Sequence, residues 1–469
     1  MNSNLKPYAE YKEAKQSWIK KVPIHWKEAK SKRLFLETSI KNHPTEELLS
    51  ATQSNGVIPR SMLKTRVVMP SGNLETFKLV KEGNFVISLR SFQGGLEYSR
   101  YRGIVSPAYN ILEERTNQNK EYYRYLFKSH DFIGELQRNV TGIRQGKNID
   151  VNDFKEIILP IPSLTEQDNI VKYLDHQLAK IKKFIKAKKK LITVLKEQKQ
   201  LVINDAVTKG LNQNVKMQPT NINFIESVPA HWRKYRLKNL VSINGRIGFR
   251  GYTQSDIVNE GEGAITLSPG NIKNQKLKLD SLAYISWDKY YESPEIMVED
   301  NDILLVKTGS SFGKAILIKN ITYPMTINPQ LVLLKKCKAH PEYFEKILFS
   351  SMFMSQISRR VIGGATPTIG QGVLGDIVFY VPDLNEQKHI IEYINHETDK
   401  IDKSIATIEK EIELITEFRT SLISNVVTGK LDVRDILLEE NGEVNAYYEI
   451  LEDETMELEE VLEGEECEV

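Results

Sequence analysis

The chain has 469 residues, of which 40% are hydrophobic, and its formal net charge is +2. This length is enough for about three folded domains. Two cysteines, Cys337 and Cys467, exclude a disulfide-stapled secreted domain, lie in no metal-ligand spacing and favour a reducing cytoplasm. Residues 1–15 contain no apolar run and no window is long enough to span a bilayer, so we expect neither a signal peptide nor a membrane helix.

The small net charge conceals an uneven distribution. Residues 439–469 contain 14 acidic residues and no Lys or Arg, which leaves +16 on residues 1–438. A basic body favours a polyanionic partner, most often nucleic acid, although a merely well-hydrated surface is the alternative. We expect the acidic tail to be a solvated extension. The alternative is a mimic of DNA that covers the basic surface.

Two sequence motifs each occur twice, in the same order. The first, VPxHW, lies in WIKKVPIHWK from Trp18 and again in FIESVPAHWR from Phe224. The second, PxLxEQ, lies in IPSLTEQDNIVKYLDH from Ile161 and again in VPDLNEQKHIIEYINH from Val381. The chain therefore consists of two copies of one plan.

The stretch between the two motifs differs between the copies. The two stretches share no run of identity, but both read as mixed α/β with short strands, such as residues 84–91 and 301–309. We expect these two strands to occupy equivalent places. In each copy a short helical segment follows, and then a Gly-rich turn that begins near Thr141 or Gly363.

A long helix is predicted after each PxLxEQ motif. Apolar residues recur in alternating steps of four and three over residues 174–206 and again over 394–426, and only the first seam contains two lysines, Lys188 and Lys199. Residues 165–211 hold 11 Lys against 5 acids, whereas residues 385–431 hold 6 basic against 9 acidic residues. Complementary charge favours pairing of the two helices with each other.

Capping residues are predicted at both ends of each helix. Ser163 and Thr165, or Asn385 in the second copy, would supply N-cap oxygens, and a glycine in VTKGL or VTGKL would end the helix. An antiparallel pair is expected because both helices leave globular domains. That arrangement would put the two domains at opposite ends.

With these motifs in this order, the chain resembles the specificity subunits of Type I restriction–modification enzymes from Trp18 to about Arg434. The resemblance implies an α+β fold with a pseudo-twofold internal repeat: two mixed α/β target-recognition domains, separated by a pair of long antiparallel coiled-coil helices. Each domain would read one half of a bipartite site in double-stranded DNA, and the helices would set the spacing. The chain itself would hold no cofactor and no catalytic site.

The resemblance also implies partners. Two modification subunits would bind S-adenosylmethionine and methylate adenine, and restriction subunits would use ATP and Mg for translocation and cleavage. The implied segments are an N-terminal extension (1–17), target-recognition domain 1 (18–160), spacer helix 1 (161–211), a linker (212–223), target-recognition domain 2 (224–380), spacer helix 2 (381–434) and an acidic tail (435–469).

Candidate DNA contacts are polar or basic residues on loops after strands or on Gly-rich turns, because such side chains reach base edges and phosphates. They are Arg90, Gln93, Arg144, Gln145, Lys147, Arg246, Arg250, Lys307, Ser310, Ser311, Thr366 and Thr368. The candidates for docking the modification subunits are Glu166, Gln167, Glu386 and Gln387. Relief of the helix dipole at the N-terminus is the alternative role for the two glutamates.

Catalysis by the chain itself is disfavoured by its motifs. KTGSSFGKA fails as a phosphate loop because only three residues separate Gly309 from Gly313 and Ala315 replaces the Ser or Thr. NPQL, from Asn328, lacks the second proline and the aromatic residue of an amino-methyltransferase motif. A coiled-coil adaptor with protein-binding heads remains the runner-up, and a stand-alone DNA-modifying enzyme is third.

Overall fold

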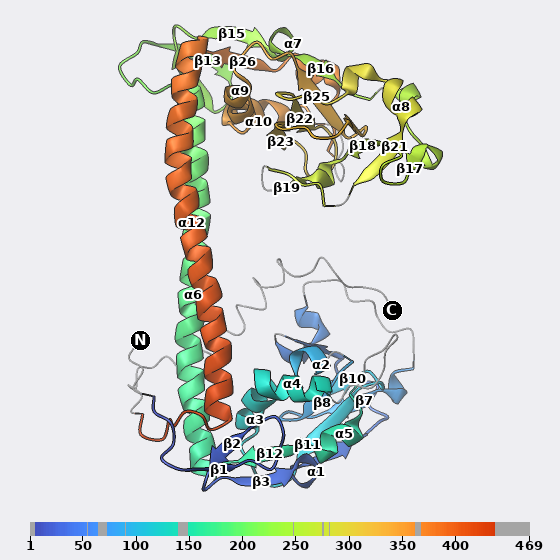
Figure 1. Ribbon diagram of the computed structural model, residues 1–469, viewed down its shortest axis with the longest axis vertical. Helices are drawn as coiled ribbons and strands as arrows, with labels where there is room; N and C mark the ends of the chain where they lie inside the picture. The colour runs from blue at the N-terminus through green and yellow to red at the C-terminus, as the bar shows by residue number, and fades with distance from the viewer. Residues whose placement is uncertain are drawn as a thin grey trace. The chain divides into compact units, whose positions relative to one another are not determined.

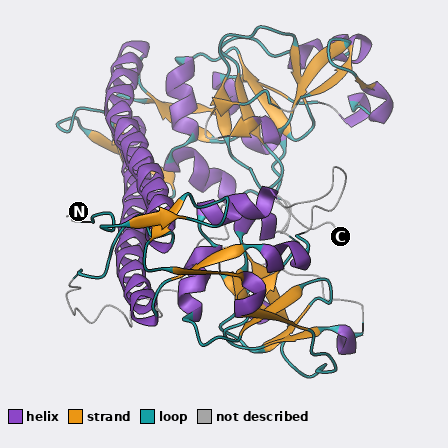
Figure 2. Ribbon diagram, turned by 60° about the horizontal axis from the view of Figure 1, so that its bottom comes forward, coloured by secondary structure: helices purple, strands orange, loops and turns teal. Residues whose placement is uncertain are grey.

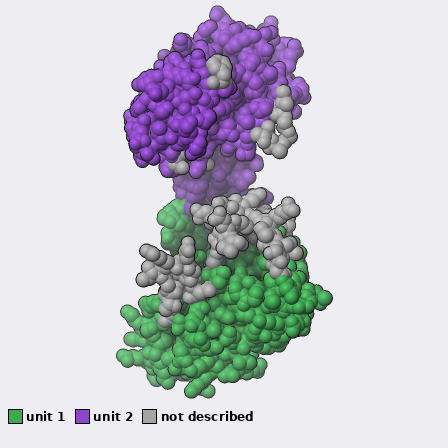
Figure 3. Space-filling view, turned by 90° about the vertical axis from the view of Figure 1, so that its right-hand side faces the viewer, with its two compact units in different colours: residues 1–188, 410–469 green, residues 189–409 purple. Residues whose placement is uncertain are grey.

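The structure is a computed structural model, and it forms two compact units (Figure 3). Unit 1 comprises residues 1–188 and 410–469, and unit 2 comprises residues 189–409. Each unit mixes short strands with helices (Figure 2). The residues that the structure describes are 5–53, 55–63, 73–89, 91–138, 149–246, 248–273, 276–280, 282–361 and 367–436, without the side chains of Phe92 and Phe249.

The central sheet of unit 1 has the strand order β4-β11-β8-β9 and is antiparallel throughout. Its strands are β4 (Phe35–Thr38), β11 (Asn110–Glu114), β8 (Phe85–Ile87) and β9 (Glu97–Tyr98). The helices that follow the sheet in the chain are α3 (Lys120–Phe127) and α4 (His130–Arg138). Rings of Phe35, Phe85 and Phe127 meet edge-on or tilted in the core that joins sheet and helices.

The central sheet of unit 2 repeats this plan in the order β16-β25-β22-β23. Its strands are β16 (Ser242–Asn244), β25 (Leu331–Lys335), β22 (Ile303–Val306) and β23 (Ala315–Leu317). Helices α9 (Pro341–Leu348) and α10 (Ser351–Ser358) follow it. The strands predicted in residues 84–91 and 301–309 are β8 and β22, so the prediction that they occupy equivalent places is confirmed.

The connections around the two central sheets also correspond. A two-stranded ladder joins β3 (Lys27–Lys30) to β12 (Ile158–Ile161), and another joins β15 (Arg233–Arg236) to β26 (Val378–Val381). Short helices α1 (Ser31–Leu34) and α5 (Val151–Glu156) in unit 1 match α7 (Leu237–Leu240) and α11 (Gln371–Gly375) in unit 2.

Each unit contains a hairpin that ends with the Val-Pro of the VPxHW motif. In unit 1, β1 (Tyr11–Glu13) pairs with β2 (Lys21–Pro23). In unit 2, β13 (Met217–Ile222) pairs with β14 (Ile225–Pro229). The segments predicted as an extension (1–17) and a linker (212–223) therefore each supply a strand to the following domain.

The remaining strands differ between the units. Unit 1 has two separate ladders, β5 (Leu49–Thr52) with β6 (Gly56–Pro59) and β7 (Lys78–Val80) with β10 (Gly103–Val105). Unit 2 instead has a second four-stranded sheet, in the order β17-β21-β18-β24, in which β18 and β24 are parallel. Its strands are β17 (Ile257–Val258), β21 (Ala283–Ser286), β18 (Gly263–Leu267) and β24 (Met325–Ile327), and the short hairpin β19 (Ile272–Lys273) with β20 (Lys276–Leu277) lies beside it in the chain.

Two long helices, α6 (Leu164–Lys209) and α12 (Leu384–Val427), run through both units (Figure 1). Unit 1 holds the first part of α6 and the last part of α12. Unit 2 holds the last part of α6 and the first part of α12, so the helices are antiparallel. The predicted seam is confirmed at most positions: Ile181 and Ile405 are buried, for example, whereas Arg419 is exposed.

The two seam lysines pair with acids of the opposite helix. Lys188 Nζ lies 2.6 Å from Glu411 Oε2 in unit 1, and Lys199 Nζ lies 2.7 Å from Asp402 Oδ2 in unit 2. The basic helix α6 and the acidic helix α12 are therefore joined by ion pairs between them.

The helix ends follow the capping rules with one correction. Ser163 Oγ accepts from the backbone N–H of Glu166 at 3.3 Å, as predicted. At α12 the cap is Asp383, whose Oδ1 accepts from the N–H groups of Asn385 and Glu386, so the prediction of Asn385 was wrong by two residues. Gly210 and Gly429 adopt positive φ after the two helices, as a left-handed cap requires.

Candidate nucleic-acid interface

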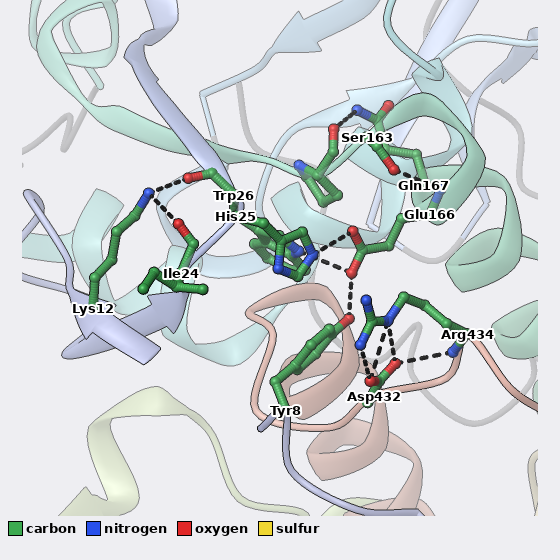
Figure 4. A network of polar contacts seen from close by, with 11 residues as sticks. Tyr8, Lys12, Ile24, His25, Trp26, Ser163, Glu166, Gln167, Asp432 and Arg434 are labelled. Atoms are coloured by element: carbon green, nitrogen blue, oxygen red, sulfur yellow. Dashed lines mark hydrogen bonds and ion pairs between the residues drawn. The ribbon is translucent and has the colours of Figure 1, made fainter. Parts of the chain in front are cut away.

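The two repeated motifs of unit 1 bind each other at the start of α6 (Figure 4). The carboxylate of Glu166 is only 3% exposed. It accepts hydrogen bonds from the Trp26 indole Nε1 at 2.9 Å and from the Tyr8 hydroxyl at 2.6 Å, and it lies 3.0 Å from His25 Nε2. Burial and the neighbouring carboxylate hold the pKa of Tyr8 well above its ordinary value, so Tyr8 remains a donor.

Unit 2 repeats this junction with different residue numbers. Glu386 accepts from Trp232 Nε1 at 3.1 Å and lies 2.8 Å from His231 Nε2. Its side chain is 27% exposed, so this copy of the junction is more open to solvent. The motifs thus recur because each VPxHW hairpin is fastened to the helix that leaves the same unit.

The adjacent glutamines, Gln167 and Gln387, bond to further backbone groups of the same unit. Gln167 donates to the backbone carbonyl of Pro162 and accepts from the N–H of Asn119. Gln387 makes the equivalent bonds to Pro382 and His340. The four residues expected to bind modification subunits are all bonded within their own unit, and their role toward a partner stays a prediction.

The structure brings four of the DNA-contact candidates of unit 2, Lys307, Ser310, Ser311 and Thr368, together at one end of its central sheet. Ile369 N–H donates to the Lys307 carbonyl at 3.0 Å, and Gly309 N–H donates to the Pro367 carbonyl at 3.0 Å. The hydroxyls of Thr308 and Thr368 are 2.7 Å apart. The loop after β22 and the end of the Gly-rich turn therefore form one surface, with Ser310 exposed and Ser311 half-buried on that loop.

Lys307 lies half-buried at the centre of this surface. Burial lowers the pKa of its ammonium group from the ordinary value. Among the described residues, its Nζ makes no hydrogen bond or ion pair. A partly desolvated cation of this kind favours a ligand that offers acceptors.

We expected Arg246 and Arg250 to contact DNA, but the structure buries the first and half-buries the second. Arg246 is only 4% exposed, and its guanidinium donates to the Ile327 carbonyl, the Thr326 hydroxyl and the Arg250 carbonyl. In this conformation Arg246 fastens its loop to the end of β24 and does not present its guanidinium to a ligand. Arg250 is half-buried and lies 3.3 Å from Glu295.

In unit 1 only one of the DNA-contact candidates can be placed. Gln93 is exposed on α2 (Ser91–Gly94), and its Oε1 lies 3.4 Å from Gln53 Nε2. The other unit 1 candidates, Arg90, Arg144, Gln145 and Lys147, lie outside the described residues, as does Thr366 of unit 2.

Residue-type reasoning missed Gln330, which is exposed directly beside Lys307. Its backbone carbonyl accepts from the N–H of Lys307 at 2.9 Å. In the sequence, the NPQL segment resembles only part of an amino-methyltransferase motif, which gives Gln330 no role. The pairing of β22 with β25 is what reveals Gln330, and pairing was not visible in the sequence.

The described residues hold neither a metal-binding cluster nor a membrane-spanning helix. They include no group of three or more His, Cys, Asp or Glu side chains arranged to hold a metal ion. None of the helices within these ranges has the length and apolar character needed to cross a membrane.

The sequence of this chain is similar to those of known proteins. The profile of the Type I restriction modification DNA specificity domain matches residues 28–194. The chain is 24% identical over 364 residues to the specificity subunit of the Type I restriction enzyme MjaVIII from Methanocaldococcus jannaschii, covering 76% of this chain and 81% of that protein. It is 22% identical to the EcoBI specificity subunit from Escherichia coli, covering 68% of each.

The fold has a counterpart among solved structures. A chain from a structure of complex assembly and conformational transition of the type I R-M system superposes with a TM-score of 0.63 at 13% identity, covering 87% of this chain and 99% of that one. At this identity the likeness concerns the fold. The profile and the two relatives indicate that this chain is similar to the specificity subunits of Type I restriction–modification systems, and the shared fold agrees with this similarity.

Proposed function

We propose that the chain recognises a bipartite site in double-stranded DNA, with each unit reading one half and with no catalytic site of its own. The observation that carries this proposal is the repetition of one strand order in two units whose loops differ. A repeated scaffold with different loops suits two half-sites of different sequence, because recognition depends on the side chains at the loop surface. The antiparallel helices α6 and α12 would set the separation of the half-sites.

The same helices are the proposed docking surface for two modification subunits. Val194 on α6 and Leu414 on α12 occupy equivalent positions of the repeat and are 49% and 52% exposed. Leu164 and Leu384 form a second equivalent pair of exposed apolar residues, at the two helix starts. Large apolar side chains on the outer face of a paired helix favour a protein partner. Two such equivalent sites suit two identical partners.

The rest of the proposal concerns the assembled enzyme. S-adenosylmethionine would be bound by the modification subunits, and ATP with Mg by restriction subunits, all acting in the cytoplasm. This chain would contribute the choice of sequence.

The test is equilibrium binding of the full chain, alone and with its modification subunits, to a pool of duplexes of random sequence. The proposal predicts enrichment of a split motif and an affinity that falls steeply with salt, because bound Lys and Arg release counterions from phosphates. Failure to bind DNA would favour the protein-binding adaptor. Methyl transfer by the isolated chain would favour the stand-alone enzyme.

A further inference from the structure

We infer that Lys307 and Gln330 of unit 2 together read a guanine in the major groove of its half-site. The inference rests on the proposed function, because it names the base that this surface selects. It is carried by the positions of the two side chains and by the hydrogen-bonding groups that remain free around them.

The two residues are cross-strand neighbours. Strands β22 and β25 pair Leu305 with Val332 and Val306 with Leu331, and the bond from Lys307 N–H to the Gln330 carbonyl at 2.9 Å extends this register by one residue. Directly opposed residues of an antiparallel pair have Cβ atoms about 4.5–5.5 Å apart and lie on the same face. Both side chains therefore leave the end of the sheet side by side.

The orientation of the Gln330 amide follows from a backbone group. The N–H of Gln330 can only donate, and it donates at 3.0 Å to the side chain of Asn328, so the Asn328 atom that it meets is Oδ1. The other atom of that amide is then Nδ2, which donates to Gln330 Oε1 at 3.2 Å. The side-chain oxygen of Gln330 is thereby engaged, and its NH₂ group makes no hydrogen bond to the described residues.

That NH₂ group is directed toward the loop that follows Lys307. A Cβ built on Gly309, which has φ +105, would lie 4.0 Å from Gln330 Nε2. The amide nitrogen and the ammonium group of Lys307 consequently border the same surface.

Three neighbouring backbone carbonyls already accept hydrogen bonds within unit 2. The carbonyl of Lys307 accepts from Ile369, that of Gln330 from Lys307, and that of Gly309 from Phe312. The hydroxyls of Thr308 and Thr368 bond each other, which leaves one hydroxyl proton. Lys307 and Gln330 therefore offer a ligand mainly hydrogen-bond donors, the ammonium group and the NH₂ group.

A pair of donors matches the major-groove edge of one base. Guanine presents two adjacent acceptors there, N7 and O6, whereas adenine adds a donor to N7, cytosine presents a donor, and thymine presents one acceptor beside a methyl group. A glutamine that reads adenine accepts through its side-chain oxygen, and in Gln330 this oxygen already accepts from Asn328, which favours the use of the NH₂ group. Guanine is therefore the base that fits.

The test is duplex selection with the full chain and its modification subunits, comparing wild type with Lys307→Met and Gln330→Glu. We expect each variant to lose about tenfold or more of its preference for G·C at the same single position, in one half-site, because a good pair of base contacts is worth roughly that much. Gln330→Glu replaces the donor by an acceptor and should shift the preference at this position toward cytosine. Lys338→Met, which removes one exposed lysine of unit 2, is the control and should leave the motif unchanged.

A base analogue locates the contact on the guanine. At that position, 7-deazaguanine removes N7 while keeping the pairing with cytosine, and it should weaken wild-type binding about tenfold while weakening Lys307→Met less. The inference is overturned if Lys307→Met lowers affinity equally for all duplexes and reduces the salt slope by about one, as loss of a phosphate contact would. It is also overturned if a split motif is found and no position responds to either variant, and the proposed function would then still stand. Absence of any sequence preference would overturn both.

Discussion

The indole nitrogen of Trp26 donates to the carboxylate of Glu166 at 2.9 Å, although the two residues are 140 positions apart in the chain. The bond joins the hairpin at the start of unit 1 to the helix that leaves it. Trp232 and Glu386 repeat the bond in unit 2 at 3.1 Å. The same junction, built twice, defines how each α/β domain is attached to its helix.

Glu166→Ala should destabilise unit 1 by about 2–4 kcal/mol, because it leaves the buried donors of Trp26 and Tyr8 without a partner. The free energy of unfolding from denaturant titration measures this loss. Glu386→Ala is the matched control, and its cost should be smaller, about 1–2 kcal/mol, because its carboxylate is partly exposed. Equal losses at the two sites would contradict the difference in burial.

Glu97 should make the stability of unit 1 depend on pH. Burial raises the pKa of its carboxyl group to about 7, and Lys128, 2.7 Å away, only partly offsets this effect. The unfolded-state pKa is lower, near 4.5. The folded state therefore holds the proton more tightly, and stability falls as pH rises between these two values, with the full penalty present above about 7.

Glu97→Gln removes this titration. Relative to wild type, the free energy of unfolding of the variant should rise by about 2–3 kcal/mol between pH 4.5 and pH 7.5. Denaturant titrations of both proteins across this range measure the difference. A difference that does not change with pH would show that Glu97 titrates normally.

Exchanging the charges of Lys199 and Asp402 tests the cross-helix pairing in unit 2. Lys199→Asp alone should destabilise the helix pair because it faces an acid, and adding Asp402→Lys should recover most of the loss. The coupling should be below about 1 kcal/mol, because both side chains are partly exposed. Thermal unfolding of the two single variants and the double variant measures it, and additive effects would exclude the pair.

Shortening both helices by one heptad tests their role as a spacer. The ion pairs match Lys188 with Glu411 and Lys199 with Asp402, so residues 190–196 of α6 lie opposite residues 404–410 of α12. Removing both segments shortens the pair by about 10 Å while keeping the seam in register. The preferred spacer in DNA should shorten by about three base pairs, measured by duplex selection. An unchanged spacer would contradict the proposed role of the helices.

Much of the fold follows from patterns that are local in the sequence. The seam of steps of four and three predicted both helices, and Gly210 and Gly429 marked their ends. The two copies of each motif predicted the repeat. The cap of α12 was predicted wrongly as Asn385, because Asp and Asn both suit an N-cap and only the backbone bonds show that Asp383 is the acceptor.

The recognition surface was less predictable, because it depends on pairing between distant segments. The sequence predicts a free arginine at Arg246, beside glycines, but two acceptors at the end of β24 and the carbonyl of Arg250 hold its buried guanidinium. The position of Gln330 beside Lys307 depends on the pairing of β22 with β25, which the sequence does not predict. Residue type alone does not reveal which side chains a fold leaves free.

The central claim is that one chain directs its enzyme to a two-part DNA sequence. A map of methylated adenines in the genome of the organism that encodes this chain tests it most directly, compared with the same strain after deletion of the chain. The account predicts one class of methylated adenines, lost on deletion, that lies in two short specific sequences separated by a fixed run of unspecified bases. A continuous motif, or a methylation pattern unaffected by the deletion, would contradict it.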